Sequence, residues 1–185
     1  MTIDLWRQPP YPERGDTDPT VIWASVGRAL SAWEMFEGHL SQQFAFFVAY
    51  GRHSRAARRA YGSVASFTGR RTLLEAAAEV YFTDTAEGAL QADFKRQMDT
   101  ASDASARRSD IAHGTVQPYA FGLNTAPLQG RRFDGYCLVP STYTSKRRDQ
   151  PAYAYASVEI NALTLRFEAM IPPAELISRE IVARR

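Results

Sequence analysis

The sequence predicts a mainly α fold, an antiparallel helical bundle with a small β-hairpin-like excursion before a C-terminal helix. Apolar residues recur at helical spacing over about 20–50, 64–82 and 86–112, short alternating segments follow residue 114, and helical spacing resumes near residue 161. The 185 residues, 45% of them hydrophobic, suffice for a single domain over 1–185. Within it we expect an extended arm over 1–19, a helical core over 20–114, strands and loops over 115–160 and a C-terminal helix over 161–185.

The N-terminal arm is rich in proline, which disfavours a helix, and the sequence indicates no chemistry there. Asp18 and Pro19 suit the start of a helix, since Asp is a good cap and Pro is tolerated in the first turn. The spacing of the helix over about 20–50 places Glu37 in the apolar stripe. Its carboxylate therefore either pairs with an arginine or reaches water at the edge of the stripe.

Three further helices are expected before residue 114: a short basic one over 55–61, one over 64–82 and one over 86–112 capped by Asp84 or Thr85. The sevenfold spacing of apolar residues in the last of these leads to Arg108, which is predicted to face the bundle, with Arg107 more peripheral. His113 then occupies the final turn. Gly114 is a natural residue to end the helix in the left-handed conformation.

The region after residue 114 changes to extended segments at 116–121, 136–139 and 153–157, which predict short strands or a hairpin. A basic stretch over 145–151 is either a phosphate-contacting loop or a solvated turn. The final helical pattern begins near Asn161 and is interrupted at Pro172 and Pro173, where a last helix can restart.

Composition restricts the classes of protein. Cys137 is the single cysteine and supports neither an internal disulfide nor a zinc site, which fits a reducing, cytoplasmic setting. The N-terminus does not resemble a signal peptide, and no apolar run approaches the length of a membrane span.

The net charge is only +2, yet many arginines come in adjacent pairs. These pairs suit phosphate binding, or they are a compositional bias on solvated surfaces.

The most informative stretch is Arg107-Arg108-Ser109-Asp110-Ile111-Ala112-His113-Gly114. Its arginine, four intervening residues and histidine resemble the signature of the HEPN superfamily, all-helical domains that include metal-independent ribonucleases and catalytically silent relatives. The resemblance covers the motif and the order of long helices over about 20–114. Ser109 stands where that family often has asparagine, so a hydrogen-bonding group is kept but the amide is not.

Metal-independent RNA cleavage needs a group that removes the proton of the ribose 2′-hydroxyl and a group that protonates the leaving oxygen. It also needs fixed positive charge at the phosphate. His113 can serve as the acid/base because histidine titrates near neutrality. Arg108 can clamp the phosphate, with Ser109 or Asp110 as an orienting group and Arg107 in support. Alternatively, Arg108 pairs with Glu37 and His113 merely caps the helix.

Five residues along a helix correspond to a rotation of about 140°, so Arg108 and His113 do not share one face. The resemblance implies a homodimer in which two copies of the motif face each other, an RNA partner, and an antitoxin or regulatory protein as a further partner. Two functions remain open. One is a metal-independent endoribonuclease of bacterial defence, stress response or toxin–antitoxin type, without metal or cofactor. The other is a non-catalytic helical dimerisation or regulatory binding module.

Other enzyme classes are disfavoured by the sequence. His39, His53 and His113 show no grouping with metal-ligand spacing, which argues against a metal-dependent hydrolase. A thiol enzyme would depend on Cys137, which lies in an apolar run where inert buried cysteine is common.

Overall fold

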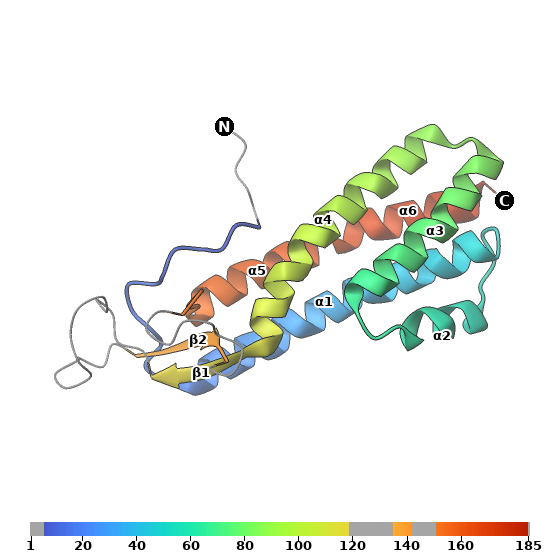
Figure 1. The fold of residues 1–185 in the computed structure, drawn as a ribbon. Helices are drawn as coiled ribbons and strands as arrows, with labels where there is room; N and C mark the ends of the chain where they lie inside the picture. Colours follow the sequence, from blue (N-terminus) through green and yellow to red (C-terminus); the bar gives the residue numbers. More distant parts are fainter. Residues whose placement is uncertain (1–5, 119–134, 142–150, 185) are drawn as a thin grey trace. The chain divides into compact units, whose positions relative to one another are not determined.

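The computed structural model describes residues 6–118, 135–141 and 151–184, and it is mainly helical with one small hairpin (Figure 1). The elements are α1 (Pro19–Val48), α2 (Arg55–Ser63), α3 (Phe67–Thr85), α4 (Gly88–His113), β1 (Gly114–Pro118), β2 (Tyr136–Pro140), α5 (Ser157–Ala169) and α6 (Ile171–Ala183). The predicted fold class is confirmed. The end of the strand expected over 116–121, and most of the basic stretch over 145–151, lie outside the described residues.

Side-chain caps explain where the first three helices begin. Thr20 donates its N–H to the Asp18 carboxylate at 2.9 Å, as expected for a capping aspartate. Ser54 and Ser66 accept N–H bonds of 3.1 Å at the starts of α2 and α3. The cap predicted at Asp84 or Thr85 is wrong, because α3 continues through Thr85 and Ala86 ends it in the left-handed region, with φ of 56°.

Packing divides the chain into two compact units, which we describe separately. The hairpin unit comprises residues 1–32 and 106–166, and the helical unit comprises residues 33–105 and 167–185. The boundaries between residues 32 and 33, 105 and 106, and 166 and 167 fall inside α1, α4 and α5. The single domain expected from the sequence stays a prediction.

Aromatic contacts organise the helical unit. Phe47 near the end of α1 lies 5.2 Å from both Tyr81 of α3 and Phe94 of α4, measured between ring centroids. Near the start of the unit, Trp33 lies 5.2 Å from Phe67 and 5.5 Å from Phe167. These pairs set α1 and α3 in the same direction with α4 antiparallel to them, and the short α2 returns the chain between α1 and α3 (Figure 1).

A reciprocal pair of amides is buried in the helical unit. Gln43 Nε2 donates to Gln97 Oε1 at 3.1 Å, and Gln97 Nε2 donates to Gln43 Oε1 at 2.7 Å. Gln43 Nε2 also donates to the carbonyl oxygen of Ala174 at 3.0 Å, which links α1, α4 and α6. Because buried amides need partners, this pair favours one register of the three helices.

The hairpin unit is built around β1 and β2, which pair antiparallel with Val116 opposite Leu138. Single bridges join Asp16 to Tyr136 and Leu138 to Tyr155. The third strand predicted over 153–157 is therefore wrong beyond the bridge at Tyr155, and α5 begins at Ser157, earlier than expected. Ser157 N and Oγ each donate to the Asp16 carboxylate at 2.7 Å, which explains this early start.

Gly114 has a different role from the one predicted. It opens β1 directly, and the described glycines with positive φ are Gly51 and Gly135. A Cβ atom on Gly114 would lie 2.6 Å from Leu138 Cγ, so glycine is required here for close packing of the hairpin.

Among the described residues, no helix combines the length and apolar character needed to cross a membrane.

Candidate functional site

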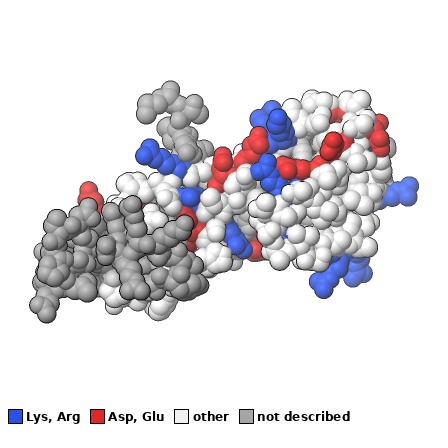
Figure 2. All heavy atoms as spheres, in the orientation of Figure 1, with Lys and Arg blue, Asp and Glu red and all other residues white. Residues whose placement is uncertain are grey.

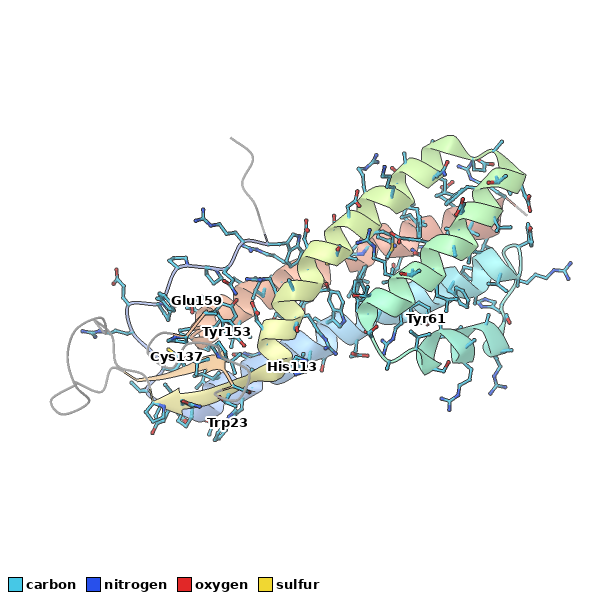
Figure 3. All side chains as sticks on the ribbon, viewed as in Figure 1. Trp23, Tyr61, His113, Cys137, Tyr153 and Glu159 are labelled. Atoms are coloured by element: carbon cyan, nitrogen blue, oxygen red, sulfur yellow. The ribbon has the colours of Figure 1, made fainter. Side chains whose placement is uncertain are left out.

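The motif occupies the last two turns of α4, in the hairpin unit. His113 is the final residue of the helix and its side chain is exposed, next to the start of β1 (Figure 3). Its carbonyl oxygen accepts a hydrogen bond of 2.8 Å from Ser141 Oγ. The carbonyl oxygen of Asp110 accepts one of 2.8 Å from Tyr153 Oη. These carbonyls belong to the last turn, which lacks helical partners, so the two bonds fix the end of α4.

The carboxylate of Asp110 is the centre of a partly buried network. Its Oδ2 atom accepts hydrogen bonds from Tyr155 Oη at 2.8 Å and Gln8 Nε2 at 3.2 Å. Arg107 Nη1 lies 3.1 Å from the same oxygen and also donates to Tyr155 Oη at 3.4 Å. Arg107 and Asp110 are three residues apart and so share one face of the helix. The described partners of this carboxylate do not include His113.

Two tyrosines form the wall of the network. The rings of Tyr153 and Tyr155 stack, with centroids 4.9 Å apart and planes inclined by 19°. Burial raises the pKa of Tyr153 to about 12, and the charge of Asp110 adds to this effect. Burial and the contact with Asp110 raise the pKa of Tyr155 further. Both phenols therefore remain neutral hydrogen-bond donors at physiological pH.

The structure changes the relative roles of the motif residues. Arg107, expected to be peripheral, has a side chain only 13% exposed and is bonded to Asp110 and Tyr155, so that expectation is wrong. Arg108 is half-buried, while Ser109 and His113 are exposed. Gln8, Tyr153 and Tyr155 also belong to this network, and the sequence did not predict them. The Tyr-Ala-Tyr alternation was a signal for two of them, whereas nothing local identifies Gln8.

Glu37 lies in the helical unit and pairs with an arginine, which was one of the two expectations for it. The partner is Arg70 of α3, whose Nη1 lies 2.8 Å from Glu37 Oε2, rather than Arg108. The carboxylate is only 6% exposed, so the alternative of a side chain reaching water is wrong. Burial raises the pKa of Glu37, and Arg70 partly opposes this effect.

A pocket of about 730 Å³ lies beside the Asp110 network. Residues 6–11 of the N-terminal arm, Arg107, Ala152 and Tyr153 line it. Its described lining contains two arginines and no carboxylate. We call it the arm pocket, and it gives the N-terminal arm a role that the sequence did not indicate.

Acidic and basic side chains are interspersed on the face drawn in Figure 2. No group of three or more His, Cys, Asp and Glu side chains among the described residues is placed to hold a metal ion. Cys137 is buried, and burial raises the pKa of its thiol to about 12.

Comparison of the chain with protein-family models, with curated proteins and with solved structures gave no match.

Proposed function

We propose that this protein is a metal-independent endoribonuclease of HEPN type, with His113 as the acid/base and Arg108 as the phosphate-binding residue. The observation that carries the proposal is the exposed side chain of His113 on a helix end whose main chain is fixed by Ser141 and Tyr153. A general acid/base must be both accessible to substrate and held in position. The resemblance of the motif to the HEPN signature supplies the reaction class.

The proposed reaction is an internal transfer at phosphorus. His113 accepts the proton of a ribose 2′-hydroxyl, the 2′-oxygen attacks the adjacent phosphorus, and the bond to the 5′-oxygen breaks. A second histidine, in its protonated form, gives a proton to that leaving oxygen. The products are a 2′,3′-cyclic phosphate and a 5′-hydroxyl. Arg108 stabilises the charge that develops on the phosphate oxygens.

A homodimer supplies the second histidine in this proposal. Arg108 and His113 are five residues apart, which corresponds to a rotation of about 140° on a helix. One copy therefore presents the two side chains in different directions. Two motifs facing each other would place the arginine of one subunit and the histidine of the other on the same phosphate.

The test is cleavage of single-stranded RNA by the purified protein in EDTA. We expect cleavage that yields cyclic phosphate ends and is lost in both Arg108→Ala and His113→Ala. Matched controls are Arg52→Ala and His53→Ala, which change exposed residues of the same types outside the motif. Cleavage that persists in His113→Ala, or that disappears equally in the controls, would contradict the proposal.

A non-catalytic dimerisation or regulatory module is the second candidate. The bonding of Arg107 and Asp110 within a partly buried network favours it, because such contacts stabilise a fold without chemistry. Absence of cleavage together with a stable dimer that persists in His113→Ala, measured by sedimentation, would select this function. A role in bacterial defence, with an antitoxin or regulatory partner, rests on the resemblance alone.

A further inference from the structure

We propose that the arm pocket binds one unstacked base of a single-stranded RNA together with its phosphate. The proposal rests on the ribonuclease function proposed above and names the form of the substrate. The pocket lies in the hairpin unit, which also carries Arg108 and His113. Its volume of about 730 Å³ is within the range of small-ligand sites and suits one nucleotide.

The arm is fastened at two points, so the pocket is preformed. Gln8 Nε2 donates to Asp110 Oδ2 at 3.2 Å, and the hydroxyl of Tyr11 donates to the carbonyl oxygen of Pro151. Pro9 and Pro10 lie between these two anchors and restrict the backbone of the segment. A site that is already ordered loses less conformational entropy when it binds a ligand.

Trp6 is the aromatic side chain of this pocket that can stack on a base. The Tyr153 ring is only 8% exposed and packs against Tyr155, so it forms a fixed wall of the pocket. Trp6 lines the pocket from the arm and is half-buried. Stacking of a base on an aromatic side chain raises affinity by roughly tenfold or more per base and tolerates any sequence.

The exposed arginine of the pocket suits a phosphate. Arg7 and Arg107 both line the pocket; Arg7 is exposed, whereas Arg107 is 13% exposed and its charge is paired with Asp110. Arg107 directs Nη1 to Asp110 and Tyr155, which holds its guanidinium in place beside the pocket. An exposed arginine next to a stacking surface is the combination with which proteins bind single strands. A base inside a duplex is stacked and paired, so it cannot enter such a pocket without being extruded.

The experiment measures binding of a fluorescent 2′-O-methyl oligonucleotide of mixed sequence by anisotropy. This probe lacks the 2′-hydroxyl and so cannot be cleaved by the proposed reaction. We expect Trp6→Ala to weaken binding roughly tenfold. Trp23→Ala is the matched control, because Trp23 is 57% exposed in the same unit and does not line the pocket (Figure 3).

A second pair of variants tests the phosphate contact. Arg7→Ala should weaken binding and lower the slope of log affinity against log salt concentration by about 1. Arg14→Ala changes an exposed arginine of the arm outside the pocket and should leave the slope as in the wild type. A double-stranded probe of the same sequence should bind at least tenfold more weakly than the single strand.

The outcomes separate this inference from the proposed function. Wild-type binding that weakens in Trp6→Ala and Arg7→Ala, in a protein that cleaves no RNA, would leave the pocket supported and the ribonuclease rejected. Cleavage of RNA with unchanged binding in Trp6→Ala and Arg7→Ala would support the ribonuclease and overturn the pocket. Absence of wild-type binding, or equal losses in the two control variants, would also overturn it.

Discussion

The phenol of Tyr155 donates a 2.8 Å hydrogen bond to the carboxylate of Asp110. The same carboxylate pairs with Arg107, which lies on α4 with Asp110. Tyr155 is fully buried and bridges to Leu138 of β2 through its main chain. This single residue therefore connects the end of α4, which carries the motif, to the hairpin. The stability of the motif depends on packing between segments that are far apart in the sequence.

Tyr155→Phe should lower the free energy of unfolding by about 1–2 kcal/mol, because the partly buried Asp110 carboxylate and Arg107 lose a common partner. Urea denaturation followed by circular dichroism measures the change. Tyr50→Phe is the matched control, since Tyr50 is an exposed tyrosine that also donates to an aspartate, Asp84. The control should change stability much less. Equal effects of the two substitutions would show that the Asp110 network adds no stability.

The pH dependence of stability should reveal the buried carboxylate of Glu37. Burial raises its folded-state pKa above the ordinary value of 4.5, so the folded state disfavours the ionised form. Stability contributed by the protonated carboxyl is present below 4.5 and is lost as the pH rises towards the folded-state pKa. The unfolding free energy of the wild type minus that of Glu37→Gln should therefore decrease as the pH rises through this interval. A constant difference between pH 4 and pH 7 would contradict the assignment.

Arg70→Met should destabilise the protein at neutral pH by about 3 kcal/mol, because it leaves the buried Glu37 carboxylate without its cation. The loss should be smaller below pH 4.5, where Glu37 is protonated. Arg71→Met is the matched control, since Arg71 pairs with the exposed carboxylates of Glu75 and Asp99. Thermal unfolding at the two pH values checks both expectations. A pH-independent loss in Arg70→Met would exclude Glu37 as the cause.

Gly114→Ala should destabilise the hairpin unit by about 1–3 kcal/mol, because the new methyl group would overlap Leu138. Gly27→Ala provides the contrast. Gly27 lies in α1 of the same unit, and a Cβ atom there meets no atom within 4 Å. This substitution should stabilise the protein by up to about 1 kcal/mol through helix propensity. Denaturant titration of both variants tests the opposite signs.

Cys137 should resist alkylation in the native protein. Its side chain is fully buried, and burial raises the pKa of the thiol to about 12, so the reactive thiolate is scarce near neutral pH. Iodoacetamide labelling followed by mass spectrometry should be slow without denaturant and fast in concentrated urea. Rapid labelling under native conditions would show that the strand β2 opens readily.

Much of the fold could be predicted from periodicity. The boundaries of α1 and α2 agree with the predicted ones to within two residues, and their starts are set by the local caps Asp18 and Ser54. The start of α5 could not be predicted in the same way. Glu159 caps this end locally, because its Oε2 accepts the N–H of Ala156 at 2.8 Å, but the second capping carboxylate, Asp16, is far away in the sequence and no local pattern links it to Ser157.

The candidate site also combines features that follow from local sequence with features that do not. The position of Arg108 and His113 at the end of a long helical pattern is a local property, so the sequence alone could predict it. The spacing also placed Glu37 in an apolar stripe, where its carboxylate would either pair with an arginine or reach water at the edge. Helical spacing gave Arg107 only a direction on α4, however, and direction alone led to the wrong expectation that it is peripheral.

The surroundings of these residues depend on contacts between distant segments of the chain. The tertiary structure brought Gln8 and Tyr155 to Asp110, selected Arg70 as the partner of Glu37, and made a pocket from an arm that had no predicted chemistry. The physical reason is that periodicity reports which face of an element is buried. The partner on that face is set by contacts between segments separated by tens or hundreds of residues, which no local pattern encodes.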